Sequence, residues 1–202
     1  MSSSDTTGKN GEQMAYKFPS EKFQKLESED RYEQLRPAER LQAAGMNPGD
    51  HVLDAGCGTG FYARSAGEVV GESGHVVGID ILEEMLEKAD EFGLPDNVEC
   101  VQSQESKFPV DESSMDWVIM TNLYHELEDP DAFIAEIRRV LTSGGKVNYL
   151  DWIPQEEEDG PPAEHRIDKS VPIAAFESAG FRWLHEATVG PSHFELIFEV
   201  NE

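Results

Sequence analysis

HVLDAGCGTG, the ten residues from His51 to Gly60, predicts more about the fold than any other stretch of the chain. The apolar pair before the acid is typical of the end of a buried strand. Glycine then occupies every second position, which lets the backbone turn sharply and lets a ligand lie directly on it. Residues 61–70 follow with a helical pattern, so the loop opens at a helix N-terminus. Together these elements predict the nucleotide cradle of a doubly wound α/β fold.

The spacing of the glycines distinguishes two kinds of cradle. The dinucleotide fingerprint is G-x-G-x-x-G, whereas here an acid precedes alternating glycines, and an acid suits a cationic group. The pattern resembles motif I of the class I S-adenosylmethionine (SAM) methyltransferases, in which the acid reaches the ammonium of the cofactor directly or through water. The resemblance implies a SAM site made by Asp54, Gly56, Cys57, Gly58 and Gly60. The alternative is a tight strand–helix turn that holds no ligand.

A second acid lies 20 residues after Gly60, where the apolar run 76–79 ends at Asp80. An acid at the end of the second strand can accept hydrogen bonds from both ribose hydroxyls. Ile81 and Met85 follow and are expected to cover the adenine ring. The alternative role for Asp80 is the N-cap of a helix over residues 83–92, and the two roles can coexist.

Composition limits the classes of protein that the chain can belong to. Its 202 residues suit one domain, and no run of 18 apolar residues exists to span a membrane. The two cysteines, Cys57 and Cys100, favour a reducing cytoplasm over a disulfide framework. No cluster has the spacing of a zinc site, so no metal is expected.

Charge is the second unusual property of the chain. It has 41 acids against 16 bases, for a formal net charge of −25. Such a surface repels nucleic-acid phosphates and anionic membranes. A basic partner would explain the charge, and so would high salt, where screening relieves self-repulsion. The even spread of the acids and the few lysines favour the second explanation and a haloarchaeal source.

The chain divides into three expected parts. Residues 1–14 are polar and are expected to be a disordered tail, and residues 15–47 form an N-terminal helical segment. That segment includes a helix over 36–44 and either covers the cofactor cleft as a lid or packs against the sheet. Residues 48–202 form the SAM-binding domain.

Strand and helix patterns alternate through this domain, which predicts a parallel sheet with helices on both faces. A final pair of strands joined by a short turn is expected to form an antiparallel hairpin. The whole matches the Rossmann-like seven-stranded methyltransferase sheet with its antiparallel last strand. The predicted strands are 51–55, 75–79, 98–102, 116–121, 146–151, 181–188 and 193–200. The predicted helices are 61–70, 83–92, 131–141 and 172–179, with a turn at Gly144-Gly145 before the fifth strand.

Three further stretches resemble the branch that includes the ubiquinone/menaquinone-biosynthesis C-methyltransferases, also called type 11. They are 108–116 (FPVDESSMD), 137–145 (IRRVLTSGG) and 176–181 (FESAGF). The branch usually has Gly-Asp-Ala after the third strand, with the acid on the adenine amino group. This chain has Ser103-Gln104-Glu105 there. The Gln104 carbonyl can accept the same bond, and Glu105 is the second candidate.

Ligands of open α/β sheets bind at the carboxyl ends of strands. Two of these strand ends have no predicted contact with the cofactor, and they are the candidates for the site of methyl transfer. Asn122 resembles the residue whose backbone carbonyl meets the SAM ammonium, and His125 would then face the methyl group as a base. Glu126 is a candidate to orient His125, and the alternative is that His125 only begins a helix or packs. The pocket for the acceptor is expected to include Tyr124, His125, Asp151 and Trp152, with His165 as a further candidate.

The absence of three features narrows the range of possible acceptor molecules. The chain lacks the Asn-Pro-Pro-Tyr motif of amino-methylating nucleic-acid enzymes, the several thiols of arsenite methylation and a paired-acid magnesium site. A small uncharged or cationic organic acceptor remains. The resemblance therefore implies SAM-dependent methyl transfer to a small molecule, with S-adenosylhomocysteine (SAH) as product. The alternative is a protein that binds SAM as a sensor or interaction module without transferring methyl.

Overall fold

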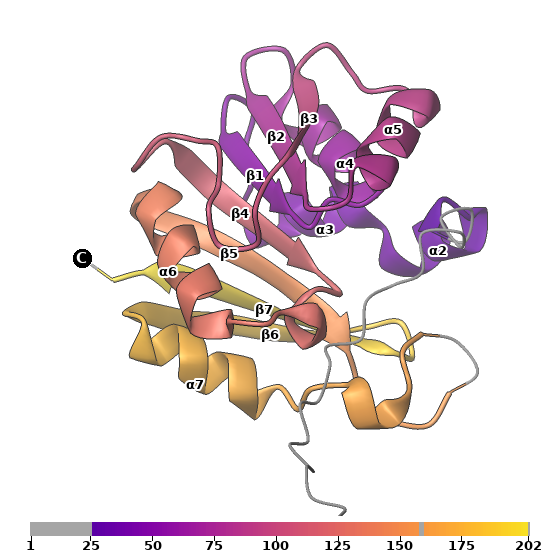
Figure 1. Ribbon diagram of the computed structural model, residues 1–202, viewed down its shortest axis with the longest axis vertical. Coiled ribbons are helices and arrows are strands. Elements are labelled where there is room, and N and C mark those ends of the chain that lie inside the picture. Colours follow the sequence, from indigo (N-terminus) through magenta and orange to yellow (C-terminus); the bar gives the residue numbers. More distant parts are fainter. Residues whose placement is uncertain (1–25, 158–159, 202) are drawn as a thin grey trace, which may run out of the picture.

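Seven strands of the described residues form one sheet in the order β3-β2-β1-β4-β5-β7-β6 (Figure 1). This computed structural model describes residues 26–157 and 160–201. Strands β1 to β5 run parallel, and β7 lies antiparallel between β5 and β6. The predicted Rossmann-like sheet with an antiparallel last strand is therefore confirmed. The strands are β1 (His51–Ala55), β2 (His75–Asp80), β3 (Val98–Gln102), β4 (Met115–Thr121), β5 (Leu141–Trp152), β6 (Phe181–Val189) and β7 (His193–Val200).

Helices cover both faces of this sheet. None of the helices in the described parts of the chain has the length and apolar character needed to cross a bilayer. The predicted tail, 1–14, lies outside the described residues, as do residues 15–25 of the predicted N-terminal segment. The helices are α2 (Glu29–Leu35), α3 (Pro37–Ala44), α4 (Phe61–Val70), α5 (Glu83–Phe92), α6 (Pro130–Val140) and α7 (Ser170–Ser178), with short 3₁₀ turns η2 (Tyr124–Glu126) and η3 (Ala163–His165).

The bounds of two elements did not follow from the sequence pattern. The expected turn at Gly144-Gly145 lies within β5, which begins at Leu141 rather than at residue 146. Leu141 pairs with Met115 and Lys146 pairs with Trp117, so residues 142–145 form an irregularity between two paired segments. Helix α2 lies in the predicted N-terminal helical segment, but its own bounds were not predicted. In both places the outcome depends on pairing or packing with distant residues, which a local pattern does not record.

The N-terminal segment is tied to the sheet through a buried ion pair. The guanidinium of Arg40, on α3, donates to both carboxylate oxygens of Glu195 on β7, at 3.2 and 2.5 Å. Asn148 on β5 donates to the same carboxylate at 2.9 Å. Because Glu195 is only 5% exposed, breaking this pair would leave an uncompensated buried charge. Helix α3 is therefore fixed against the body of the domain.

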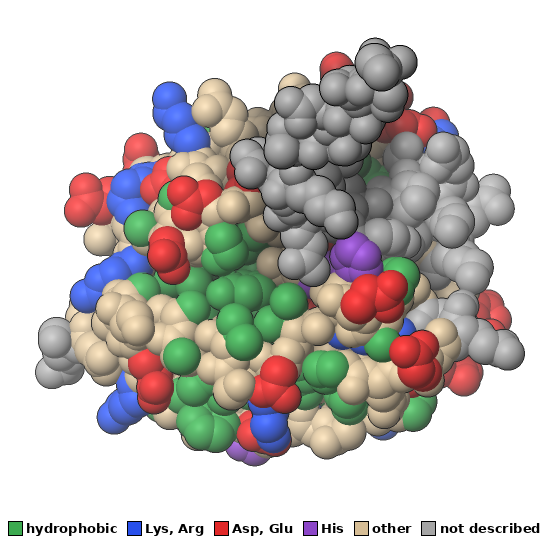
Figure 2. All heavy atoms as spheres, turned by 60° about the horizontal axis from the view of Figure 1, so that its bottom comes forward, with side chains coloured by type: hydrophobic (Ala, Val, Ile, Leu, Met, Phe, Trp, Pro, Cys, Tyr) green, Lys and Arg blue, Asp and Glu red, His purple; other side chains and the backbone are tan. Residues whose placement is uncertain are grey.

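Acidic side chains on the visible face of the molecule are spread out rather than gathered into one patch. Figure 2 shows acidic groups scattered across one face, with basic groups among them. Several basic groups pair with acids, as Arg182 does with Glu199 and Lys169 does with Glu186. Since the chain has 41 acids and 16 bases, most acids have no basic partner available.

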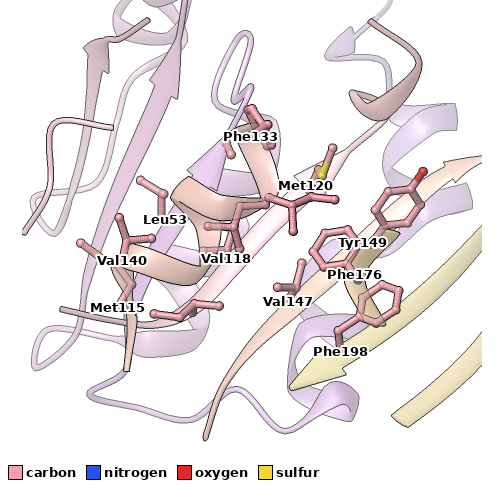
Figure 3. Close-up of a cluster of buried hydrophobic side chains, with 14 of the residues drawn as sticks. Leu53, Met115, Val118, Met120, Phe133, Val140, Val147, Tyr149, Phe176 and Phe198 are labelled. Carbon is pink, nitrogen blue, oxygen red and sulfur yellow. The ribbon is translucent and has the colours of Figure 1, made fainter. Parts of the chain in front are cut away.

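Alternate residues of each strand enter the two halves of the core, as the pleat of a strand requires. Leu53 points to the cluster that α6 and α7 cover, and Val52 points to the cluster that α3 and α4 cover. Figure 3 shows the first of these clusters, in which Phe133 of α6 and Phe176 of α7 meet side chains from the central strands. These two core clusters hold the strands in register. The carboxyl ends of the strands carry the candidate site.

Candidate functional site

A cavity of about 540 Å³ lies at the carboxyl ends of β1, β2, β4 and β5. Its size is in the range of small-molecule and cofactor sites. Helix α2, the glycine loop after β1 and the segments after β2, β4 and β5 all contribute to its lining, together with His193 of β7. Six described residues have buried side-chain polar atoms without a hydrogen-bond partner, and five of them line this cavity: Asp54, Tyr62, Thr121, Asn122 and His193. Buried polar groups are normally paired, so this concentration indicates a site for a polar ligand.

The glycine loop forms one wall of the cavity. Gly56, Gly58 and Gly60 all have left-handed backbone conformations, with φ of +72°, +53° and +78°. A Cβ added to Gly56 would collide with Leu123 at 2.8 Å, whereas one added to Gly58 would meet nothing closer than Leu26 at 4.0 Å. Both glycines line the cavity, so at Gly58 a side chain would enter open space that a ligand can use.

Asp54 carries an unpaired negative group at the base of this loop. The residue is 2% exposed, it lines the cavity, and its Oδ2 has no hydrogen-bond partner. Burial raises the pKa of the Asp54 carboxyl to about 7, and a backbone hydrogen bond from Ala63 only partly offsets this effect. A buried carboxylate of this kind favours a cationic ligand, because burial of charge is costly without a partner. The residues present therefore fit the ammonium group of SAM.

Asp80 holds the glycine loop to the end of β2. Its Oδ2 accepts a hydrogen bond from the backbone N–H of Gly58, and its Oδ1 accepts one from Leu82, both at 2.9 Å. Burial raises the pKa of Asp80. The alternative role as N-cap of α5 was wrong, because Leu82 is the N-cap and no side chain caps it. Each carboxylate oxygen of Asp80 retains a lone pair that can accept from a ribose hydroxyl.

Of the four residues expected around the adenine ring, three line the cavity and one does not. Met85 is buried, Ile81 is partly exposed, and both line the cavity, as does Glu105. The carboxylate of Glu105 also accepts from the backbone N–H groups of residues 128 and 129. Gln104 is exposed and is not part of the lining. Cys57 also lines the cavity, and its free thiol lies 3.9 Å from that of Cys100.

His125 and Asp151 form a buried pair beyond the glycine loop. The Nδ1 of His125 lies 3.1 Å from Oδ1 of Asp151, and the side chains are 3% and 1% exposed. The expected partner Glu126 is farther, at 3.9 Å from Nε2. Burial opposes protonation of His125, but the hydrogen bond and charge of Asp151 outweigh it and raise the pKa of His125. Asp151 is itself held by the hydroxyl of Tyr149 at 3.1 Å.

Other residues predicted for the acceptor pocket are divided between the cavity and the core. His125, Trp152 and Asn122 line the cavity. Asn122 has a left-handed backbone with φ of +54°. Tyr124 instead belongs to the core, where its ring contacts Tyr149 at a centroid distance of 6.0 Å. Neither Tyr124 nor His165 is part of the lining, and Asp151 lies behind His125.

His193 was missed by the sequence analysis. It lies on β7 directly opposite Trp152 of β5, and the two rings are 4.0 Å apart. Both ring nitrogens of His193 are buried without a partner, and burial lowers the pKa of His193 to about 4. A neutral imidazole therefore faces the cavity. The register of the antiparallel β5–β7 pair was the available signal, since it places His193 beside a residue already assigned to the pocket.

Arg31 and Tyr62 are two further cavity residues that the sequence analysis missed. Arg31 comes from α2, and Tyr62 is the second residue of α4. Neither belongs to a motif, so their positions could be found only from the packing of α2 against the loop. Among the described residues, no group of three His, Cys, Asp or Glu side chains is arranged to hold a metal ion.

The sheet order, the glycine loop and the acids at the ends of β1 and β2 define a SAM-binding protein of the class I type. A family model described as "Methyltransferase domain" matches residues 53–148. A solved SAM-dependent methyltransferase from Aquifex aeolicus is 33% identical, with a TM-score of 0.86, and the likeness covers 92% of this chain and 100% of that one. The chain therefore belongs to the SAM-dependent methyltransferase family, whose cofactor is SAM and whose product is SAH.

Two other comparisons limit what this membership implies. The ubiquinone/menaquinone biosynthesis C-methyltransferase UbiE of Vibrio vulnificus strain YJ016 is 28% identical over 156 residues, which are 73% of this chain and 60% of that protein. The chain thus spans about 60% of the length of that curated relative. The crystal structure of the cyclase SpnF is 19% identical with a TM-score of 0.69, covering 82% of this chain and 80% of that one. The likeness to SpnF concerns the fold alone.

Proposed function

We propose that this chain transfers a methyl group from SAM to a small-molecule acceptor. The observation that carries the proposal is that the cavity continues past the glycine loop to Trp152, His125 and His193. A module that only binds the cofactor needs no such space. Here the space is lined by an aromatic ring and two imidazoles, which suits a second, organic ligand.

The cofactor end of the cavity offers candidate partners for the ammonium, the ribose and the adenine of SAM. Asp54 would bind the ammonium group, since its Oδ2 is buried and unpaired. Asp80 would accept from the ribose hydroxyls while it holds Gly58 in place. Met85 and Ile81 would cover the adenine, and the lining favours Glu105 over Gln104 for the adenine amino group. The backbone of the loop would approach the ligand closely because Gly58 has no side chain.

At the acceptor end, His125 is the candidate base. SAM bound in this cavity would supply a methyl group to the acceptor atom and would leave as SAH. His125 would take the proton that the acceptor loses, and Asp151 would stabilise the imidazolium that results. Holding the two ligands in line supplies most of what such a displacement needs, about 7–11 kcal/mol of the barrier. His193, which is neutral, would hydrogen-bond to the acceptor instead of taking its proton.

The N-terminal segment serves two purposes in this proposal. Helix α3 is fixed by Arg40 and has a structural role. Residues of α2 and the turn before it line the cavity, so this part would act as the lid. Glu27 connects it to the glycine loop, since its carboxylate accepts from the Thr59 hydroxyl at 2.5 Å and from Arg64.

The charge of the chain and its resemblance to a curated relative support a class of acceptor. A net charge of −25 opposes nucleic acids as substrates. The resemblance to UbiE, a protein named for ubiquinone and menaquinone biosynthesis, makes a quinol ring the first acceptor to test. The free thiols of Cys57 and Cys100 support a reducing compartment such as the cytoplasm.

The proposal is tested with methyl-labelled SAM and a panel of quinols, phenols, amines and thiols. Transfer of label to one class by the wild type, and its loss in His125→Ala with SAH binding retained, is the expected result. Binding of SAH with no transfer to any acceptor of the panel would instead support the alternative, a sensor or interaction module. Exposed His51, far along β1 from the loop, provides the matched control as His51→Ala, which should transfer label normally.

A further inference from the structure

Arg166 is a buried cation in the segment between β5 and α7. Its side chain is 0% exposed, although arginine is almost never fully buried unless it is paired. The Nε of Arg166 donates to the carbonyl of Pro161 at 2.9 Å, and Nη1 donates to the carbonyl of Ile153 at 3.1 Å. Nη1 also pairs with Oε2 of Glu157 at 2.6 Å. The planar guanidinium therefore joins three points of this segment.

Glu157 extends this network to the turn between β6 and β7. Its Oε1 accepts from the hydroxyl of Ser192 and from the side-chain amide of Gln155, both at 2.7 Å. The amide of Gln155 also donates to the carbonyl of Pro191 at 3.0 Å. The segment after β5 is thus fastened, through one carboxylate, to the turn that leads into β7.

The network supports one wall of the cavity, which we call the loop wall and which consists of Gly160 and Pro161. Both residues line the cavity, and Pro161 is the residue whose carbonyl Arg166 binds. Gly160 has a φ of +86°, and a Cβ there would lie 2.9 Å from the indole of Trp152. The guanidinium of Arg166 lies over the same indole, at 4.9 Å from the ring centroid. Because the ring of His193 also contacts Trp152, this indole is held by the segment after β5 and by β7 together.

We propose that Arg166 is a positioning residue for the methyl acceptor. Together with Glu157 it holds the loop wall against Trp152, and the acceptor is thereby enclosed beside His193, away from water. An uncharged planar molecule fits this end of the cavity, since the charge of Arg166 is already balanced by Glu157. The inference rests on the proposed function, because it requires an acceptor in this space. The competing role for Arg166 is stability of the fold alone.

His193 reports whether the loop wall is in place. Burial lowers the pKa of His193 to about 4. Of the charged groups around it, Asp151 and Glu157 raise this pKa, and Arg31 and Arg166 lower it. Opening of the wall would hydrate the imidazole and raise its pKa toward about 6.5. Loss of the Glu157 charge alone would lower the pKa, so the two effects have opposite signs.

The test combines NMR titration of His193 with binding and transfer measurements on the full chain. Arg166→Lys keeps the charge but loses the planar fork, and Glu157→Ala removes the carboxylate that fastens the segment to the β6–β7 turn. Both variants should raise the pKa of His193 from about 4 toward about 6.5. Calorimetry should show that both bind SAH like the wild type.

Transfer of label from SAM to hydroquinone measures the effect on the acceptor. In both variants the KM for hydroquinone should rise roughly 10-fold while the KM for SAM is unchanged, because only the acceptor end has lost its wall. Glu156→Ala provides the matched control, since it removes the charge of an exposed acid one residue away from Glu157. This control should keep the low pKa of His193 and the wild-type KM for hydroquinone.

Each other outcome has a defined meaning. An unchanged pKa of His193 in Arg166→Lys, or a fall in that pKa in Glu157→Ala, would overturn the inference, because the wall would then be closed without these contacts. Equal weakening of SAH and hydroquinone would indicate stability of the fold alone and would also overturn it. If Glu157→Ala does not fold, Arg166→Lys decides the question by itself, since it leaves the buried charge paired. Failure of the wild type to bind SAH would instead reject the proposed function, while the titration of His193 still decides whether Arg166 holds the wall.

Discussion

Asp80 accepts a hydrogen bond through Oδ2 from the backbone N–H of Gly58, at 2.9 Å. The acid that ends β2 therefore positions the loop that follows β1. Its other oxygen is bonded to the backbone of Leu82, so the carboxylate connects three segments of the cofactor site. Asp80 thus has a structural role in the loop in addition to its predicted contact with ribose.

Substituting Asp80 should weaken the cofactor more than the loss of the ribose contact alone. Asp80→Ala removes one hydrogen bond to the glycine loop, one to Leu82 and two predicted ligand contacts, and the expected loss in SAH affinity is roughly 100-fold or more by calorimetry. Asp90→Ala deletes an exposed acid of the neighbouring helix α5 and serves as the control for charge. An unchanged SAH affinity in Asp80→Ala would mean that the ribose lies elsewhere.

Asp54→Asn should raise the stability of the ligand-free protein and lower that of the protein with SAH. Burial raises the pKa of Asp54 from 3.8 to about 7, so the folded state binds more protons than the unfolded state between these values. Stability then falls as pH rises from about 4 to 7, and the penalty above pH 7 is up to about 4 kcal/mol. Asparagine carries no such penalty. Thermal melting at pH 5 and pH 8 should reveal a gain at pH 8 that SAH cannot increase further. A loss of stability at pH 8 would contradict this account.

The His125–Asp151 pair should make the fold more stable at low pH than at high pH. An isolated buried histidine would have the opposite effect. Asp151 raises the pKa of His125, so the pair stabilises the fold below the unfolded value near 6.5. That contribution disappears as pH rises through the higher folded pKa. Asp151→Asn should therefore cost about 3 kcal/mol near pH 6 and much less near pH 9, measured by urea unfolding. A cost independent of pH would indicate packing alone. NMR titration of His125 should give a lower pKa in the variant.

Salt should stabilise this protein well beyond the dilute range. At a net charge of −25, self-repulsion opposes the folded state, and the screening length falls from about 30 Å at 0.01 M salt to about 3 Å at 1 M. If screening recovers about 3 kcal/mol, the melting temperature should rise by roughly 6–12 °C between these concentrations of potassium chloride. An equal rise with sucrose would indicate general burial effects. A flat response would favour a basic protein partner over a halophilic origin.

The parts predicted well from the sequence are those with local signals. The predicted strand 51–55 and helix 61–70 coincide with β1 and α4, because apolar periodicity and alternating glycines mark both ends. The pairing of His125 with Asp151 was not predicted, since it joins η2 to the end of β5 across the sheet. A local reading favoured Glu126 because it is adjacent in the chain.

Other misses have the same physical origin. His193 enters the cavity only because β7 inserts antiparallel beside β5, which sets its register opposite Trp152. Arg31 enters it because α2 packs over the glycine loop, where its guanidinium lies against Phe61. Neither position carries a motif. The tertiary arrangement of strands and helices, and not the local pattern, brings these side chains to the site.

The central claim is that the cavity at the glycine loop binds SAM and SAH, and calorimetry with SAH tests it most directly. The account predicts binding at one site by the wild type. Gly58→Val should abolish it, because the side chain enters the open space at a φ of +53°. Gly93→Val is the matched control, since Gly93 has a φ of +83° with nothing within 4 Å and lies outside the cavity lining. This variant should bear similar backbone strain yet bind SAH. No binding by the wild type in dilute or molar salt, or normal binding by Gly58→Val, would contradict the account.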